Sequence, residues 1–129
     1  MQWSSEKNCG FSKSDTPYLP TDSSTNVPTV EEQLNDETSL LNFVKHLIQI
    51  RHAHPALWAD GEYITIKSGY PLVFERQSKE ERIRVAINPS AEQKTFVDPD
   101  CASILFSHHA VVSDNEIILA SRGCLIYTL

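Results

Sequence analysis

Hydrophobic and polar residues alternate along most of the chain beyond residue 60, with the period of two that is typical of strands. The clearest case is the segment 82–87, where charged and apolar residues take turns as in a half-buried strand. Such segments recur roughly every ten residues between turns, a spacing that favours an antiparallel β-sandwich or a small barrel. We expect a mainly β, Greek-key-like sandwich of seven or eight strands, at 62–67, 72–77, 82–87, 94–97, 102–106, 110–112, 116–120 and 124–129.

A helical period marks one segment ahead of these strands. Its apolar side chains recur at helical spacing, at Leu40, Leu41, Val44, Leu47 and Ile48. This pattern predicts a single long amphipathic helix over 37–53. Asn35 or Asp36 would cap it, with Glu37 in the first turn. Pro55 ends the helix, because the residue before a proline avoids the helical region. The apolar face is broad, so we expect neighbours on more than one side.

The first 39 residues contain too few apolar side chains to form a core. They hold two basic residues against seven acidic ones and are rich in Ser, Thr, Asp, Asn and Pro, which is typical of an extended loop. Four large apolar residues are nevertheless spaced along it: Trp3, Phe11, Tyr18 and Leu19. We therefore expect the loop to pack on a surface outside itself. Thr29 and Glu32 fit a capping box, which predicts a short helical turn through about Leu34.

The length and charge of the chain argue against several kinds of protein. With 129 residues it has the size of one domain and is too short for a (β/α)₈ barrel, which needs about 250. A net charge of −6 argues against a nucleic-acid partner, because phosphate-binding surfaces need clustered Lys and Arg. No apolar run approaches the ~20 residues of a membrane span, and we expect no signal peptide. Three widely spaced cysteines favour a reducing, cytoplasmic location.

No set of residues in the sequence forms a credible active site. His52 and His54 straddle the end of the predicted helix, where we expect them to contact the last carbonyl groups rather than a metal. His108-His109 lies in a predicted turn without further ligands at metal-binding spacing. The acidic pairs Glu31-Glu32 and Glu80-Glu81 fall at a helix start and in a hairpin turn, among solvated residues. We therefore predict no catalytic residue, no metal site and no cofactor in this chain.

The N-terminal half carries a series of motifs in a fixed order. They are Met1-Gln2-Trp3, Asn8-Cys9-Gly10-Phe11-Ser12, Pro17-Tyr18-Leu19-Pro20, Val30-Glu31-Glu32-Gln33, Asp36-Glu37-Thr38-Ser39-Leu40-Leu41-Asn42-Phe43 and Ile48-Gln49-Ile50-Arg51-His52-Ala53-His54-Pro55-Ala56-Leu57. Together they resemble one stretch of the α-amylase superfamily, glycoside hydrolase family 13. The similarity is to its α-glucosidase, oligo-1,6-glucosidase and trehalose-synthase branch. Beyond Gly61 the resemblance is one of architecture.

This resemblance implies how the chain is organised. Residues 1–58 would be the end of a catalytic barrel, namely the loop after its eighth strand and its last helix. Residues 59–129 would be a C-terminal all-β sandwich domain. The family's catalytic carboxylates lie on earlier strands, so none is expected among these residues. Gln2 and Trp3, with Met1, match the family motif and are the candidates for the mouth of the parent active site.

Three hypotheses about function follow. By resemblance, the chain is the non-catalytic C-terminal part of a retaining glycoside hydrolase that acts on α-glucosides or α-glucans. It would be inactive alone, and its partner would be the barrel of its own full-length chain. Alternatively, a free-standing sandwich binds carbohydrate on exposed aromatic platforms, or it is a structural domain only. The aromatic residues to consider are Trp58, Tyr63, Tyr70 and Phe74, most of which we expect in the core or against the helix.

Overall fold

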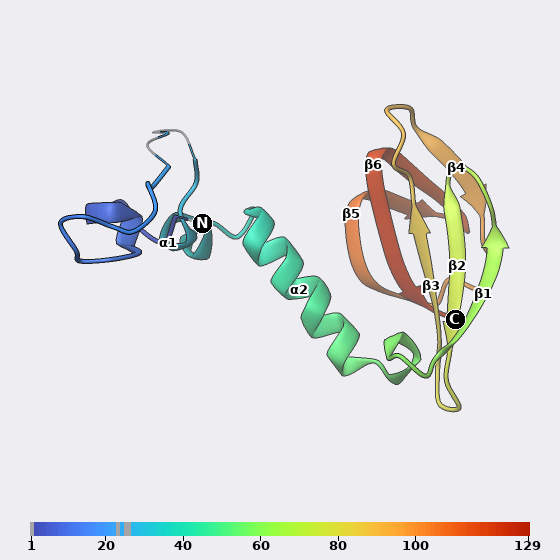
Figure 1. Ribbon diagram of the computed structural model, residues 1–129. Helices are drawn as coiled ribbons and strands as arrows, with labels where there is room; N and C mark the ends of the chain where they lie inside the picture. Colours follow the sequence, from blue (N-terminus) through green and yellow to red (C-terminus); the bar gives the residue numbers. More distant parts are fainter. Residues whose placement is uncertain (1, 23, 25–26) are drawn as a thin grey trace. The chain divides into compact units, whose positions relative to one another are not determined.

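The computed structural model describes residues 2–22, 24 and 27–129 (Figure 1). They group into two units, Met1–Gln49 and Ile50–Leu129. In chain order, the elements are the 3₁₀ turn Lys7–Gly10, helices α1 (Val30–Asn35) and α2 (Leu40–Ala53), the 3₁₀ turn Pro55–Leu57, and strands β1 (Glu62–Lys67), β2 (Leu72–Gln77), β3 (Arg82–Ile87), β4 (Lys94–Val97), β5 (Ser103–Ser113) and β6 (Glu116–Thr128). None of the helices in this part of the chain combines the length and hydrophobicity of a membrane span.

Hydrogen bonds within the first unit tie the start of the loop to the start of α1. The N–H of Val30 donates to the carbonyl oxygen of Gln2 at 2.9 Å. Next to it, the N–H of Glu31 donates to the carbonyl oxygen of Trp3 at 3.0 Å. The loop's large apolar side chains stay exposed: Trp3, Phe11, Tyr18 and Leu19. The loop is therefore ordered by polar contacts.

The short helix α1 begins with the predicted capping box. The hydroxyl of Thr29 accepts the N–H of Glu32 at 3.1 Å, and the carboxylate of Glu32 accepts the N–H of Thr29 at 2.8 Å. Two of the N–H groups that a helix start leaves unpaired are satisfied in this way. The predicted helical turn is confirmed and ends at Asn35.

The predicted cap of the long helix is wrong. The carboxylate of Asp36 instead accepts the N–H and the hydroxyl of Thr38, at 2.9 and 2.7 Å, and closes a turn between the two helices. Ser39 is the cap, because its hydroxyl accepts the N–H of Asn42 at 3.2 Å and α2 begins directly after it. Glu37 therefore lies before the helix rather than in its first turn.

The second unit is a six-stranded sheet in which every strand pair is antiparallel. The strand order is β1-β2-β3-β6-β4, and β5 also pairs with β6. The first four strands occupy their predicted ranges, because turn residues at their ends interrupt the alternating pattern. A mainly β, sandwich-like fold is therefore confirmed.

The structure has six strands rather than seven or eight. The last four predicted strands are the halves of two long ones, β5 and β6, which bend instead of ending (Figure 1). The bends lie at His109 and Arg122, whose φ angles of 50° and 56° are left-handed. Beside the second bend, a Cβ on Gly123 would lie only 2.6 Å from the carbonyl oxygen of His109. Polar residues and glycine therefore mark bends within strands here, as they mark turns elsewhere.

The bend in β6 lets one strand pair with two different partners. Residues 116–119 pair with β4, whereas residues 124–128 pair with β3. The buried side chains beside this bent strand form the main core: Val73, Ala86, Ile117, Leu119, Leu125 and Tyr127. A smaller cluster contains Ala56, Ile83 and Val85, so that β3 contributes to a core on each of its faces.

A row of ionic and hydrogen-bonding side chains crosses the sheet beside the main core. Glu75, Arg84 and Tyr127 lie opposite one another on β2, β3 and β6. Arg84 donates to Glu75 at 3.1 Å and to both carboxylate oxygens of Asp98 at 2.7 and 2.8 Å. Arg82 adds a bond of 2.7 Å to Glu75, and the hydroxyl of Tyr127 donates to Asp98. Both carboxylates are almost fully buried, so their charges depend on these partners.

The same contacts shift the acid–base equilibria of the row. Hydrogen bonding from Arg82 lowers the pKa of Glu75 below its ordinary value of 4.5. Burial alone would raise the pKa of Asp98, but hydrogen bonds from Tyr127 and Arg84 outweigh it and bring the pKa below 3.8. Burial, together with the bond to Asp98, raises the pKa of Tyr127. At neutral pH the row thus holds two charged carboxylates and one neutral phenol.

Replacing the buried aspartate should destabilise the second unit. In Asp98→Asn, Arg84 keeps its charge and loses a buried counter-charge, so we expect the free energy of unfolding to fall by about 3 kcal/mol. Urea denaturation followed by circular dichroism measures the change. Asp100→Asn is the matched control, because Asp100 is exposed and lies 3.6 Å from the same guanidinium. It should cost less than about 1 kcal/mol, and equal losses in the two variants would contradict this account.

Acid should weaken the fold through the same two carboxylates. Their pKa values are lower in the folded than in the unfolded chain, so their stabilising effect is complete above about pH 4.5 and is lost as the pH falls further. Urea midpoints measured between neutral pH and about pH 3 should fall steeply at the acid end. Glu75→Gln should start lower and show a shallower fall. A slope identical to that of the unchanged chain would show that Glu75 does not titrate with unfolding.

Candidate functional site

The segment between α2 and β1 follows a tight path. Pro55 starts the 3₁₀ turn, which places Ala56, fully buried, in the smaller core cluster. Gly61 then passes close to this turn, where a Cβ would lie 2.1 Å from the carbonyl oxygen of Ala56. Only glycine fits at this position. The path therefore brings the residues after Ala56, including Trp58, back toward the sheet.

One arginine from the sheet holds three carbonyl groups of this segment. Arg76 on β2 donates from Nε to the carbonyl oxygen of Ala56 at 3.2 Å. Its Nη2 donates to the carbonyl oxygens of Trp58 and Gly61, at 2.6 and 2.9 Å. A planar guanidinium offers several donors in a rigid fork, which suits a cluster of carbonyl groups. The backbone on either side of Trp58 is thereby fixed.

The predictions for His54 and for His108-His109 are wrong. His54 does not contact the carbonyl groups at the helix end but bonds through Nδ1 to Glu81, at 2.8 Å. The carboxylate of Glu81 also accepts the N–H of Ala56 at 3.0 Å, so it is a half-buried structural group rather than a solvated one. His108 and His109 lie within β5 rather than in a turn, with ring centroids 4.0 Å apart. Among the described residues, no group of three or more His, Cys, Asp or Glu is arranged to hold a metal.

The aromatic residues named as possible platforms are mostly exposed. A contact with the core or the helix, as expected, is made by Phe74, which packs against the smaller core cluster, and by Trp58, which bonds to the end of α2. Trp58, Tyr63 and Tyr70 are 47%, 52% and 62% exposed. Phe74 is half-buried and stacks on Tyr63 with a centroid distance of 5.1 Å. Strand β1 lies at one end of the strand order and is covered on neither face by the core clusters, which leaves its aromatic side chain in solvent. Of the four, Trp58 lines a pocket.

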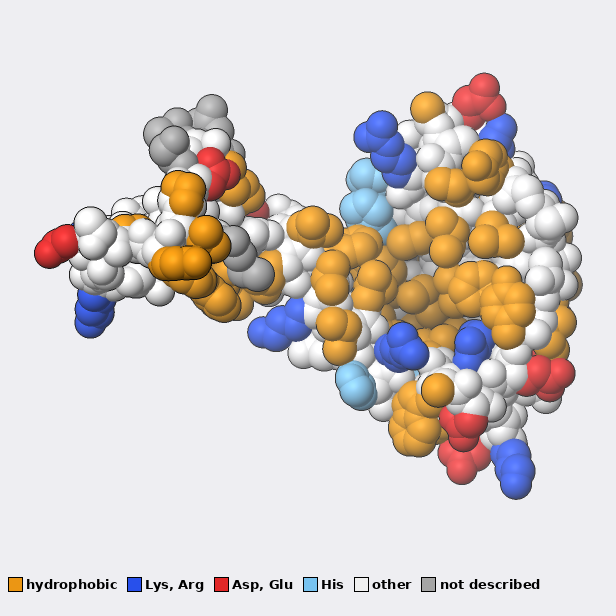
Figure 2. Space-filling model, in the orientation of Figure 1, with side chains coloured by type: hydrophobic (Ala, Val, Ile, Leu, Met, Phe, Trp, Pro, Cys, Tyr) orange, Lys and Arg blue, Asp and Glu red, His pale blue; other side chains and the backbone are white. Residues whose placement is uncertain are grey.

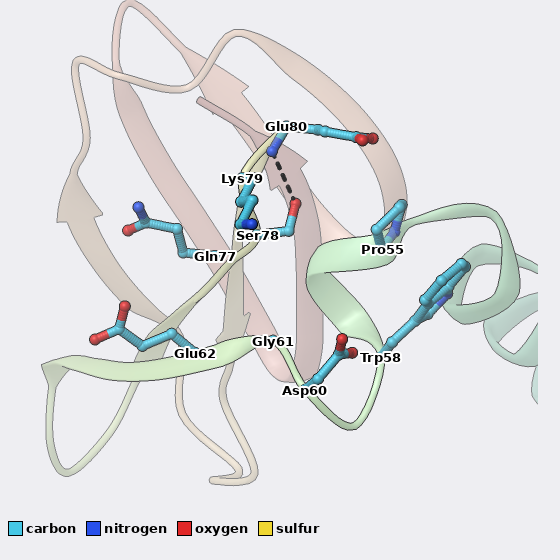
Figure 3. Close-up of a pocket in the computed structure, with 9 residues that line it drawn as sticks. All are labelled: Pro55, Trp58, Asp60, Gly61, Glu62, Gln77, Ser78, Lys79 and Glu80. Atoms are coloured by element: carbon cyan, nitrogen blue, oxygen red, sulfur yellow. Dashed lines mark hydrogen bonds between the residues drawn. The ribbon is translucent and has the colours of Figure 1, made fainter.

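That pocket has a volume of about 570 Å³ and lies between the Trp58 segment and the turn that joins β2 to β3 (Figure 3). The indole N–H of Trp58 donates to the carbonyl oxygen of His52 at 3.3 Å. The other lining residues are mostly polar: Pro55, Asp60, Gly61, Glu62, Gln77, Ser78, Lys79 and Glu80. Within the described residues, five of these side chains have no hydrogen bond or ion pair: Asp60, Glu62, Gln77, Lys79 and Glu80.

The pocket offers groups for binding rather than for nucleophilic chemistry. Its one hydroxyl, that of Ser78, accepts the N–H of Glu80 at 3.2 Å (Figure 3). It also accepts the N–H of Glu81 at 3.2 Å and so holds the turn together. A serine nucleophile would instead need an adjacent base to take its proton. The unpaired carboxylates and amide are free to accept hydrogen bonds from a ligand.

The residues predicted for the mouth of an active site lie in the first unit. Gln2 donates from Nε2 to the carbonyl oxygens of Asp22 and Ser24, at 3.2 and 3.4 Å, and so closes the loop. It also lines a loop pocket of about 380 Å³, in which the carboxylate of Asp22 already accepts the N–H of Ser24. Trp3 is 49% exposed, and Met1 lies outside the described residues. A place for Gln2 and Trp3 at an active site stays a prediction.

Sequence reasoning missed the two side chains that hold the segment between α2 and β1 in place, Arg76 and Glu81. Arg76 and Glu81 act across 15 to 27 residues of chain, so no local pattern marks them. The one available signal is that Arg76 follows Leu72 and Phe74 on one face of β2 and interrupts the apolar pattern of that face.

Comparisons with known proteins agree with these observations. Residues 1–60 match the family model "Alpha amylase, catalytic domain". The probable oligo-1,6-glucosidase 2 of Bacillus subtilis (strain 168) is 32% identical over the whole chain, which covers 24% of that protein. The trehalose synthase/amylase TreS of Mycolicibacterium smegmatis is 35% identical over 57% of the chain and 13% of its own length.

The fold also matches solved structures. The trehalulose synthase MutB from Pseudomonas mesoacidophila MX-45 superimposes with a TM-score of 0.81 and 26% identity, over 98% of this chain and 24% of that one. The chain thus spans about a quarter or less of the length of these relatives. Sequence motifs, relatives and fold agree, and the chain belongs to the α-amylase superfamily, glycoside hydrolase family 13, in its α-glucosidase and trehalose-synthase-like branch.

Proposed function

We propose that this chain is the non-catalytic C-terminal part of a glycoside hydrolase that acts on α-glucosides, and that its β-sheet unit stabilises the catalytic barrel. Residues 1–58 are then the loop after the eighth barrel strand and the last barrel helix, and residues 59–129 are the C-terminal domain. Support comes from the family match over residues 1–60 and from relatives several times longer than the chain.

The observation that carries this proposal is an apolar stripe on α2. Leu40, Val44 and Ile48 recur every four residues along the helix and are 72%, 44% and 49% exposed. Figure 2 shows hydrophobic side chains gathered over this helix. Burying each of them would contribute about 1.5–3 kcal/mol, so a stripe of this kind is expected to have a cover. Because it falls within the segment that matches a catalytic domain, we infer that the cover is the barrel of the same chain.

The reaction we assign to the complete enzyme is cleavage or transfer of α-linked glucosyl units. Relatives described as an oligo-1,6-glucosidase and a trehalose synthase/amylase support this substrate class. In the retaining route, one carboxylate forms a glycosyl-enzyme while a second carboxyl group acts first as acid and then as base. We place both groups on barrel strands that precede these residues. The reaction needs no cofactor, and the three unpaired cysteines support a cytoplasmic location.

The chain alone should not hydrolyse α-glucosides. It offers no pair of carboxyl groups that we assign to the reaction, so nitrophenol should be released from a nitrophenyl α-glucoside at the rate seen in buffer. A longer product of the same reading frame that includes the barrel should be active under the same conditions. Turnover by the 129-residue chain would refute the assignment.

Removing the apolar stripe should change both the isolated chain and the complete enzyme. In the isolated chain, Leu40→Ser/Val44→Ser/Ile48→Ser should reduce binding of the dye ANS, because less apolar surface is exposed. In the complete enzyme, the same change should lower the midpoint of thermal unfolding and leave substrate preference unchanged. The matched control places serine on the polar face of α2, at Lys45, Gln49 and His52, and should alter neither property. A stripe variant that leaves the complete enzyme fully stable would exclude the barrel as the cover.

A further inference from the structure

The pocket beside Trp58 has the features of a sugar subsite. We propose that it binds one pyranose unit of a neutral α-glucoside. The shape and chemistry of the pocket favour a pyranose ring as its ligand. The choice of an α-glucoside rests on the proposed function.

Trp58 supplies an apolar platform. A pyranose ring has faces of C–H groups and a rim of hydroxyl groups, and a half-exposed indole offers a flat apolar surface to such a face. The indole N–H donates to the carbonyl oxygen of His52 at 3.3 Å, which fixes the ring relative to the backbone. The platform is therefore oriented before a ligand arrives.

The polar lining suits hydroxyl groups. The carboxylates of Asp60, Glu62 and Glu80 can accept hydrogen bonds, and the amide of Gln77 can both donate and accept. No protein group in the described ranges occupies these four side chains. Three carboxylates against the single Lys79 make the lining negative, which favours a neutral sugar over a sugar phosphate. A metal fits less well, because no three potential ligands in this part of the chain converge on one point.

The segment that carries the platform is rigid. Arg76 holds the carbonyl groups of Trp58 and Gly61, and Gly61 packs against the turn at Ala56 with no room for a Cβ. Little backbone freedom remains to be lost on binding, which favours affinity. The volume of about 570 Å³ also falls within the range of roughly 300–1,000 Å³ that is typical of small-molecule sites.

Fluorescence of the whole chain tests the proposal. The chain has two tryptophans, so Trp3→Phe leaves Trp58 as the only reporter. Titration with isomaltose or maltotriose should give a saturable change with a Kd on the order of 1 mM. A glucose phosphate should bind about tenfold more weakly, because its charge is repelled by the lining.

Variants test whether binding depends on Trp58 in particular or on any exposed aromatic side chain. By ligand-observed NMR, Trp58→Ala should weaken binding by at least about tenfold, whereas Trp58→Phe, which keeps an aromatic plane, should stay within about threefold. Gln77→Ala should lose an intermediate amount of affinity. Tyr70→Ala is the matched control, because Tyr70 is more exposed than Trp58 and lies outside the pocket, and it should leave the Kd unchanged.

Three results would overturn the subsite: no saturable change, unchanged affinity in Trp58→Ala, or an equal loss in Tyr70→Ala. Circular dichroism on each variant shows whether the fold is kept. If Trp58→Ala unfolds, Gln77→Ala is the deciding variant, and unchanged affinity in it would overturn the subsite. These measurements do not involve the α2 stripe. If sugar does not bind but the α2 stripe variant behaves as expected, sugar binding alone is rejected. If sugar binds but the stripe variant leaves the complete enzyme fully stable, the barrel contact alone is rejected.

Discussion

The guanidinium of Arg84 is the group on which the second unit depends. It lies between two buried carboxylates, Glu75 on β2 and Asp98 after β4. Without it, Asp98 would be an uncompensated buried charge and Glu75 would keep Arg82 as its single charged partner. β3 carries apolar residues on both faces, so burial alone distinguishes poorly between neighbouring registers. A slip of one residue would turn Arg84 over to the face of the sheet that Ala56 packs against, away from both partners. We infer that the ionic row selects the register that the two cores stabilise.

Much of the fold could be predicted from the sequence because its signals are local. The first four strands and the Thr29 capping box each depend on residues within one short window. The strand count and the helix cap could not be read in this way. A glycine and a polar residue look alike whether a strand ends or bends, and only pairing with β4 and β3 decides the case at Arg122. Likewise, several polar residues before α2 could cap it. The carboxylate of Asp36 instead accepts the N–H of Thr38, and Ser39 is left as the cap.

The candidate site was less predictable for the same reason. The sequence named Trp58 but not its exposure, because exposure depends on where Arg76 and Glu81 hold the surrounding backbone. These contacts join residues far apart in the chain and have no signature in periodicity or spacing. The motifs around Gln2 and Trp3 show the opposite case: they identify a family readily, yet the side-chain hydrogen bonds of Gln2 close a loop and reveal no ligand.

The bend of β6 has a consequence for how this protein can change over generations. At Gly123 the space beside the backbone is smaller than a single methyl group, since any Cβ would meet the carbonyl oxygen of His109 at 2.6 Å. Every missense change at that codon adds at least this atom, and no side chain elsewhere can relieve its clash with a main-chain oxygen. Homologues that share the bend should therefore keep glycine there, and those that have lost it should be found to have divided β6 into two strands.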